Sequence, residues 1–376
     1  MKIDRILLNA IKSQLGKNKV LVLVGARRVG KTFLLNELES GYADKVLRLN
    51  GDLPETYQLL NSQNVQTYTR ILNGAKLLLI DEAQVIPGIG KILKIMIDHF
   101  KDLTILATGS SSFDLSNRLG EPLTGRQITY QLYPVWQGEL SPLESPVETM
   151  RNLEDRLIYG SYPEVITLPT DAERRQYLQE LASSYLLKDI LIYESVRNSH
   201  KLLQLLQLIA LQVGQEVSLQ ELANQLALSK DTVSKYLDLL TKVFIIYRVG
   251  AFSSNLRKEI VKSAKWYFTD NGIRNSLINN FASLEVRNDR GALWENYLMA
   301  ERIKHNAYTQ HYAVPHFWRT YDQQEIDLVE ASDQNLNAYE FKWNKGKAKP
   351  PLFFVKSYPQ AIFQVINRDT YIDFIQ

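Results

Sequence analysis

The stretch KVLVLVGARRVGKTFLLNEL, at positions 19–38, constrains the fold more than any other part of the sequence. A run of β-branched and aliphatic residues leads into Gly25, four residues follow, and Gly30, Lys31 and Thr32 come next. This spacing satisfies the pattern G-x-x-x-x-G-K-[ST], with the required strand pattern before it and helical pattern after it. Glycines are needed because backbone N–H groups must wrap around phosphates, and a side chain would block that approach. The stretch therefore predicts a strand, a phosphate-binding loop and a helix.

Two further segments predict the rest of a nucleotide site. KLLLIDEAQ ends a buried strand with Asp81, which would hold Mg²⁺ through water, and Glu82, which would orient the attacking water. The alternative for this pair is a charge pair at a helix N-terminus. TILATGSSS ends the next strand, and the hydroxyl of Thr108 or Ser110 would sense the γ-phosphate. The predicted nucleotide-binding residues are Gly25, Arg28, Gly30, Lys31, Thr32, Phe33, Asp81, Thr108 and Ser110, with Thr32 and Asp81 as magnesium ligands and Lys31 and Glu82 as catalytic residues.

The pattern of apolar runs predicts the fold class of the first 140 residues. Short apolar runs alternate with helical segments, and the runs lie at 19–25, 44–51, 75–83, 102–111 and 126–135. Continuous apolar strands that alternate with helices are typical of a parallel sheet covered on both faces. We therefore expect an α/β domain at 1–140.

After residue 140 the pattern of apolar residues changes, and three further regions can be distinguished. Apolar residues at helical spacing predict a helical lid or linker segment at 141–210, which begins at the Pro/Ser-rich stretch SPLESPVE. Two helices joined by a tight turn and followed by a strand predict a helix-turn-helix domain at 211–285. A helix followed by three strands predicts an α/β domain at 286–376.

The glycine loop with twin arginines, LLLIDEAQ, ATGSSS, LTGRQITYQLYPV and YGSYPEV together resemble the prokaryotic AAA+-type ATPases that carry a C-terminal domain of unknown function. The resemblance continues through SSYLLKDI and YFTDNGIRNSL to EIDLV and YEFKW, and so covers nearly the whole chain. It implies an additional-strand P-loop fold with ATP as nucleotide, then a helical segment, a winged-helix domain and a nuclease-like domain. It also implies that Arg126 in TGRQ is a catalytic arginine near the nucleotide; a surface or salt-bridged arginine is the equal alternative.

The second helix of the helix-turn-helix is a candidate DNA-reading element. It would present Lys230, Thr232 and Lys235 to a groove while apolar residues pack inward. A basic wing would add phosphate contacts from Arg257, Lys258, Lys262 and Lys265. The alternative is a module that only packs or contacts protein.

A set of acidic residues suggests a second chemistry near the C-terminus. Glu340 and Lys342 in YEFKW lie two apart on a strand and so share a face, Asp327 in EIDLV lies on the preceding strand, and Glu295 lies on the helix before them. Three acids around one point would bind a divalent cation, and Lys342 would stabilise developing charge. The set is similar to the PD-(D/E)XK nuclease core. The alternative is a retained nuclease fold that serves as a DNA platform.

The composition limits which classes of protein and of binding site are compatible with the chain. The 376 residues are 45% hydrophobic and 23% charged, which is typical of a globular protein of two to four domains. There is no cysteine, which excludes disulfides and thiolate metal sites. The net charge of +3 means that a DNA-binding surface must be a local patch. No apolar run approaches the roughly 20 residues that span a bilayer, and no signal-peptide pattern is present, so we expect a cytoplasmic protein without membrane partners.

These features predict an ATP-binding and ATP-hydrolysing P-loop protein that couples its nucleotide state to a winged-helix and nuclease-like module. The predicted ligands are ATP and Mg²⁺, and the predicted partner is double-stranded DNA or another protein. The alternative is a nucleotide-gated binding or scaffold protein with an inactive nuclease-like domain. The intact Glu82 favours hydrolysis over simple gating.

Overall fold

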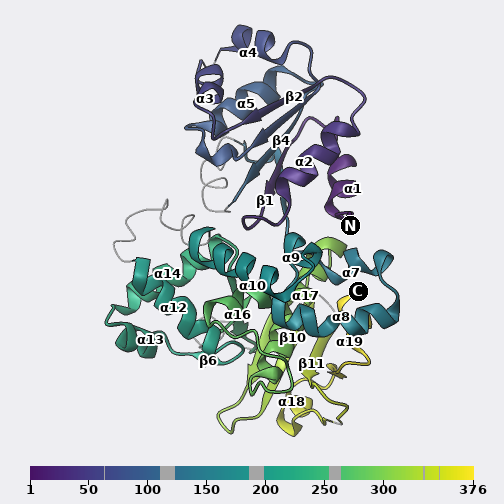
Figure 1. Cartoon of the computed structure of the whole chain (residues 1–376), viewed down its shortest axis with the longest axis vertical. Helices are drawn as coiled ribbons and strands as arrows, with labels where there is room; N and C mark the ends of the chain where they lie inside the picture. The colour runs from purple at the N-terminus through teal and green to yellow at the C-terminus, as the bar shows by residue number, and fades with distance from the viewer. Residues whose placement is uncertain (63, 111–122, 186–198, 254–263, 333–334, 347) are drawn as a thin grey trace. The chain divides into compact units, whose positions relative to one another are not determined.

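The computed structural model describes residues 1–62, 64–110, 123–185, 199–253, 264–332, 335–346 and 348–376. The chain divides into two compact units, which are residues 1–133 with 242–244 and residues 134–241 with 245–376. Figure 1 colours the elements of both units from the N-terminus to the C-terminus. No helix in the described ranges has the length and apolar character needed to cross a lipid bilayer.

The first unit is built on a five-stranded parallel sheet. Its strands are β1 (Val20–Val24), β2 (Val46–Asn50), β3 (Leu77–Asp81), β4 (Thr104–Gly109) and β5 (Gln127–Gln131). They are ordered β2-β3-β4-β1-β5 and all pairs are parallel. Every residue of β1, β3 and β4 is buried, as a sheet covered on both faces requires. Because β4 lies between β1 and β3, the order is that of the additional-strand P-loop fold, and the predicted fold class is confirmed.

Helices flank this sheet, as Figure 1 shows. They are α1 (Leu7–Lys12), α2 (Lys31–Ser40), α3 (Pro54–Leu60), α4 (Val65–Leu72), the short 3-10 helix η1 (Ala83–Val85) and α5 (Ile89–His99). The strands are parallel, so the carboxyl ends of β1, β3 and β4 meet at one edge of the sheet, and α2 and η1 begin at that edge. The fold thereby gathers the glycine loop and the Asp-Glu pair at a single edge.

The second unit contains most of the helices. They are α7 (Gln137–Leu140), η3 (Ser141–Leu143), α8 (Pro146–Tyr159), α9 (Pro163–Thr167), α10 (Asp171–Glu180), η4 (Leu181–Tyr185), α12 (Ser199–Leu211), α13 (Leu219–Leu226), α14 (Lys230–Lys242), α16 (Asn271–Leu277), α17 (Arg290–Thr309), α18 (Leu352–Ser357) and α19 (Tyr371–Ile375). The stretch SPLESPVE, read from sequence as a linker, forms η3 and the start of α8. Ser145 and Glu148 form a capping box there, so the serine and prolines mark a helix N-terminus.

A seven-stranded mixed sheet runs through the second unit. Its strands are β6 (Glu216–Val217), β7 (Ile246–Ala251), β8 (Ala264–Phe268), β9 (Val314–Arg319), β10 (Glu325–Ser332), β11 (Asn335–Phe341) and β12 (Ile362–Ile366), in the order β12-β11-β10-β9-β7-β8-β6. β7 pairs in parallel with β9, where Gly250 faces His316 and Ala251 faces Phe317. One sheet therefore takes strands from both the predicted helix-turn-helix region and the predicted nuclease-like region. The domain limits at 140, 210 and 285 stay predictions.

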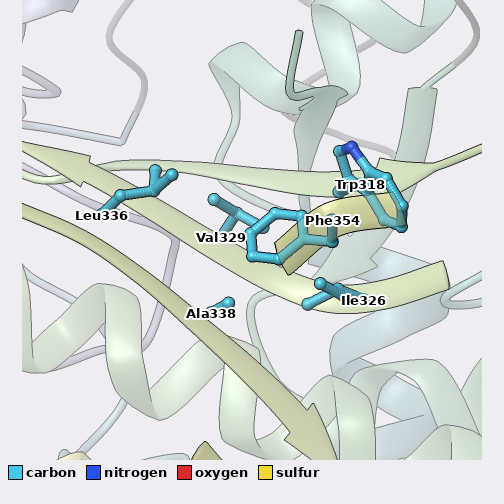
Figure 2. Packing of buried hydrophobic residues seen from close by; sticks show 6 residues of the cluster. All are labelled: Trp318, Ile326, Val329, Leu336, Ala338 and Phe354. Atoms are coloured by element: carbon cyan, nitrogen blue, oxygen red, sulfur yellow. The ribbon is translucent and has the colours of Figure 1, made fainter. Parts of the chain in front are cut away.

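An apolar cluster holds α18 against this sheet. Figure 2 shows Phe354 of α18 lying among Trp318 of β9, Ile326 and Val329 of β10, and Leu336 and Ala338 of β11. The rings of Trp318 and Phe354 meet edge to face with their centroids 5.1 Å apart, a favoured aromatic geometry. On β11 the two cluster residues are two positions apart, as the period of two predicts, whereas on β10 they are three apart because the pairing with β9 shifts register between Ile326 and Val329.

The segments YGSYPEV and DNGIRNSL are joined by buried hydrogen bonds. The carboxylate of Asp270 accepts a hydrogen bond from the backbone N–H of Ser161 at 2.6 Å, and the Asn275 amide donates to the carbonyl of Leu157 at 3.0 Å. A Cβ on Gly160 would lie 2.0 Å from Asp270 Oδ1, so only glycine fits there. These two segments, which carried part of the family resemblance, therefore form a structural joint between α8 and α16.

A group of charged side chains extends these contacts to the start of α17. Arg287 donates two hydrogen bonds of 2.8 Å to the carboxylate of Asp289, and Arg274 of α16 pairs with the same carboxylate. The side chains of both arginines are almost completely buried, so each needs the charged partner. Asp289 therefore stabilises two buried cations at once.

We expect Asp289→Asn to destabilise the protein at neutral pH and to do so less in acid. Burial by itself raises the pKa of Asp289, but hydrogen bonds from Arg287 and Arg274 outweigh it and lower the pKa to about 2, below the value of about 3.9 in an unfolded chain. The ionised carboxylate therefore contributes stability above about pH 4, and this contribution disappears as the pH falls through 2. Thermal unfolding of both proteins across this range is the measurement. A difference in melting temperature that stays constant with pH would contradict the prediction.

Candidate nucleotide site and acidic cluster

The loop after β1 has the backbone geometry that its glycines predict. Gly30 has a φ of +101°, in the left-handed region that favours glycine. A Cβ on Gly25 would lie 2.3 Å from the carbonyl oxygen of Leu132, so no side chain fits there. The buried Lys31 ammonium donates to the carbonyls of Gly25 and Ala26 at 2.8 and 3.0 Å. The loop therefore closes around the lysine that was predicted to contact phosphate.

Asp81 is the residue at which the predicted nucleotide site comes together. Its Oδ2 accepts a hydrogen bond from the Thr32 hydroxyl at 2.9 Å, and its Oδ1 accepts one from the Thr108 hydroxyl at 2.5 Å. The Thr108 hydroxyl also accepts from the backbone N–H of Glu82 at 3.1 Å. α2, β3 and β4 thus each place one side chain at one point. The hydroxyl and carboxylate oxygens of Thr32 and Asp81 are the donor type that Mg²⁺ prefers, so the residues present fit that ion.

Glu82 is held by a residue that the sequence analysis did not select. Gln84 is buried, and its side-chain amide donates to Glu82 Oε2 at 2.5 Å and to the Ser110 hydroxyl at 3.4 Å. Glu82 itself has a φ of +49°, an uncommon backbone conformation for a residue with a side chain. The Q of DEAQ was the available sequence signal, since it lies two positions after the predicted catalytic glutamate. Gln84 links that glutamate to the end of β4.

Two arginines near the loop were also missed. Arg5 precedes α1, is buried, and donates to the backbone carbonyls of Val29 and Tyr133, each at 2.6 Å. Arg48 on β2 lies 3.9 Å from the Asp81 carboxylate. No local motif marks either residue, because each reaches the site only through the fold.

Two other predicted nucleotide-binding residues also lie at the loop. Arg28 is exposed and has a φ of +64°, and Phe33 is half-buried one turn into α2. Arg126 is different. It precedes β5, and its carbonyl accepts from the backbone N–H of Val20 at the start of β1. Its guanidinium is paired at 2.8 Å with Asp98 of α5. Arg126 therefore lies at the edge of the sheet opposite the glycine loop, and the structure does not bring it to the nucleotide site of its own chain.

The predicted acids of the second unit lie close enough to influence one another. Burial, and then the charges of Glu295 and Glu340, hold the pKa of Asp327 well above its ordinary value. Burial also raises the pKa of Glu295 despite the charge of Lys265. The Asp327 carboxylate accepts from the backbone N–H of Phe341 at 2.7 Å, and Glu340 pairs with Lys342 at 2.6 Å. The fold thus brings α17, β10 and β11 to one acidic cluster.

Lys265 corrects one expectation of the sequence analysis. It was placed in an exposed basic wing, but it lies on β8 with its side chain buried. Its ammonium is 3.3 Å from Glu295 Oε1 and also pairs with Glu325, while Tyr267 donates to Glu295 at 2.6 Å. A buried ammonium needs carboxylate partners, and the acidic cluster supplies them. The other wing residues, Arg257, Lys258 and Lys262, lie outside the described residues.

The arrangement does not support a cation site at these acids. In the ranges that the structure describes, no three His, Cys, Asp or Glu side chains are grouped so that they could hold a metal ion. The Lys265 ammonium already pairs with both Glu295 and Glu325. The metal role of Glu295, Asp327 and Glu340, with Lys342 as their partner, therefore stays a prediction without structural support.

The candidate DNA residues lie on α14. Lys230 and Lys235 are exposed, whereas the Thr232 hydroxyl contacts Ser229 Oγ at 2.8 Å in the turn before the helix. Ser229 in turn accepts from the Thr232 N–H at 3.1 Å, so the pair caps the helix. Lys230 also lines a hollow of about 530 Å³ between the start of α13, α14 and strands β7 and β8, together with Arg248 and Trp266. Two lysines are therefore available to solvent.

Comparison with known proteins shows which families the successive parts of the chain resemble. Residues 17–141 match a family described as an AAA domain, and residues 150–284 and 290–362 match two domains of unknown function, DUF8612 and DUF4143. An uncharacterized protein of Haemophilus influenzae is 28% identical over 284 residues, covering 69% of this chain and 69% of that protein. One of Mycobacterium tuberculosis is 27% identical over 348 residues, covering 88% of this chain and 72% of that protein.

One solved structure adds a likeness in fold. A Walker-type ATPase of Pyrococcus abyssi has a TM-score of 0.50 and 17% identity, and the match covers 74% of this chain and 96% of that chain. At this identity the likeness shows the fold alone. With the matched AAA domain and the strand order of the first unit, it shows a P-loop NTPase fold with additional domains, and it supports a P-loop ATPase family.

We expect Asp327→Asn to raise the melting temperature at pH 8. Because the pKa of Asp327 is raised in the folded protein, ionising this carboxyl costs folding free energy at high pH. Asparagine is always neutral and keeps an oxygen for the Phe341 N–H. The gain should shrink as the pH falls and wild type binds the proton. The exposed Asp322→Asn, with the same chemical change, serves as control and should have no effect. A loss of stability at pH 8 would count against the prediction.

Proposed function

We propose that this protein binds and hydrolyses ATP in its first unit and contacts double-stranded DNA through its second unit, so that the nucleotide state controls the DNA-bound state. The observation that carries the ATPase proposal is the set of hydrogen bonds from Thr32 and Thr108 to Asp81. This set joins the glycine loop to both strand ends that phosphoryl transfer requires. In a loop that matched the motif only by chance, we would not expect its threonine to donate to a β3 carboxylate that also binds a threonine of β4.

The chain's own residues have separable roles in this proposal. The loop N–H groups and the N-terminus of α2 bind the phosphates, and Lys31 exchanges its carbonyl partners for phosphate oxygens. Mg²⁺, held by Thr32 and Asp81, neutralises phosphate charge when it is bound. Glu82 orients the attacking water, and Gln84 sets the direction of the Glu82 carboxylate. Thr108 holds Asp81, so the γ-phosphate contact is left to Ser110.

The DNA part of the proposal is supported by the order of elements in the second unit. α12, β6, α13, α14, β7 and β8 follow one another in the order of a winged helix, and α14 exposes two lysines. Lysines bind phosphate as point charges and hold a helix at a groove. Thr232 is occupied in the helix cap, so its proposed contact with DNA is through the backbone turn rather than a base edge.

For the acidic cluster we propose a structural and DNA-supporting role without cleavage. The observation that favours this is Lys265, whose ammonium lies among the carboxylates. A buried ammonium and a divalent cation neutralise the same charges, and the lysine is covalently fixed in place. The competing proposal, a scaffold that binds another protein and no DNA, is separated by the salt dependence of DNA binding.

We expect Lys31→Ala to weaken ATP binding by about 10- to 100-fold, since a charged hydrogen bond contributes about 1.5–3 kcal/mol, and to lower turnover with it. Glu82→Gln should keep ATP binding and lower turnover by about 10²- to 10⁴-fold, the range of general-base catalysis. Equilibrium binding of labelled ATP and phosphate release are the measurements. Lys17→Ala is the matched control, since Lys17 is exposed and precedes β1, whose opposite end carries the loop. Unchanged binding and turnover in Lys31→Ala would refute the nucleotide site.

The double substitution Lys230→Ala with Lys235→Ala should weaken binding to duplex DNA at every sequence tested. Each phosphate contact contributes about 0.9 to the slope of log affinity against log salt, so the slope should fall by about 2. Arg151→Ala with Arg175→Ala removes two exposed charges from the same unit and is the control. A wild-type protein that binds no DNA at low salt would favour the scaffold alternative.

A further inference from the structure

Two arginines lie against the ring of Trp343, which follows the end of β11 by two residues. The guanidinium carbon of Arg368 lies 4.8 Å from the centroid of the Trp343 ring, and that of Arg290, the first residue of α17, lies 5.7 Å from it. Trp294 meets the same ring edge to face at 5.5 Å. Trp343 is half-buried, so its position is fixed by packing while its surroundings reach solvent. Two segments far apart in the sequence thus bring their cations to one aromatic ring.

The charges of these two arginines are not balanced by acids. Nearby, Lys342 is paired with Glu340 and Lys345 is paired with Asp369 at 2.7 Å. No ion pair joins Arg290 or Arg368 to a carboxylate among the residues that the structure describes. Asp289, next to Arg290 in the sequence, is already bound by two other arginines. Lys342 and Lys345 each have a carboxylate partner, whereas the two arginines at Trp343 add positive charge without one in the described part of the chain.

This geometry suits an anion with evenly spaced phosphate groups. A guanidinium that stacks on an aromatic face keeps its N–H donors in its own plane, where they can bind phosphate oxygens in pairs. The stacking also limits the rotamers of the arginine, so less entropy is lost when it binds. Both guanidinium carbons lie within 5.7 Å of one ring centroid, so the site presents two cations close to a single aromatic side chain.

The two tryptophans of this site are next to charged residues of the acidic cluster in the sequence. Trp343 follows Lys342 by one residue, and Trp294, which packs on Trp343, precedes Glu295 by one residue. Carboxylates on an acidic protein are the competing partner, but they lack the regular spacing of phosphates along a strand.

We propose that Arg290, Trp343 and Arg368 form a clamp for the sugar-phosphate backbone of DNA. The proposal rests on the proposed DNA contact of the second unit and adds a site to it that is independent of α14. The clamp contacts phosphates and reads no bases, so it holds the duplex without sequence preference.

The test measures the binding of the full-length protein to a fluorescent duplex over a series of salt concentrations by anisotropy. Arg290→Gln with Arg368→Gln should lower the salt slope by about 2, since each phosphate contact contributes about 0.9. It should also weaken binding at low salt by about tenfold or more. The single Arg368→Gln, at an exposed position, should lower the slope by about 1 and serves if the double variant does not fold. Arg151→Gln with Arg175→Gln is the matched control and should bind as wild type.

A charge-preserving variant separates the clamp from simple attraction. Arg290→Lys with Arg368→Lys should restore the salt slope without restoring the affinity, because lysine keeps the charge and loses the planar pair of donors. Full recovery of both would overturn the stacked clamp. So would glutamine variants that bind DNA as wild type does.

Two further results distinguish failure of the proposed function from failure of the clamp. If wild type binds no duplex at all, the proposed function fails together with the clamp; if wild type loses affinity only with Lys230 and Lys235 replaced, the clamp alone fails. A labelled poly-glutamate peptide tests the other class of partner. If the glutamine variants lose the peptide and keep the duplex, the partner is an acidic protein and the proposal is wrong.

Discussion

The first unit depends on one shared carboxylate. Asp81 accepts hydrogen bonds from Thr32 of α2 and Thr108 of β4, so the glycine loop and two strand ends are fixed relative to one another. The strand order makes this possible, since β4 lies between β1 and β3 and brings its threonine between the two motifs. A buried carboxylate without such partners would cost several kcal/mol. The same contacts that satisfy Asp81 therefore also align the residues that would act on a phosphate.

The second unit is organised by buried charges that satisfy one another. Asp289 forms ion pairs with Arg274 and Arg287, and Lys265 forms ion pairs with Glu295 and Glu325. Removing one member of such a group leaves an uncompensated buried charge, which is far more costly than the group's own net contribution. At the acidic cluster, the buried ammonium of Lys265 supplies a fixed positive charge beside Glu295 and Glu325.

In the proposed function, ATP is handled in one unit and DNA is held in the other. Glu82, the proposed catalytic residue, has an uncommon backbone conformation and is held by Gln84, which also contacts Ser110 just after β4. The proposed DNA contacts on α14 and at Trp343 involve phosphates only, so affinity would depend on charge and shape rather than on sequence.

The sequence by itself determined the glycine loop, the five parallel strands and the Asp-Glu pair, because continuous apolar runs and short motifs depend only on neighbouring residues. It also predicted that Glu295, Asp327 and Glu340 lie around one point. Only the tertiary structure decided that Arg126 lies at the opposite edge of the sheet and that Lys265 is buried among acids instead of exposed on a wing. Arg5 was equally beyond local pattern. The partners of these three side chains are set by strand order and packing between distant segments, and these have no signature in a short stretch of sequence.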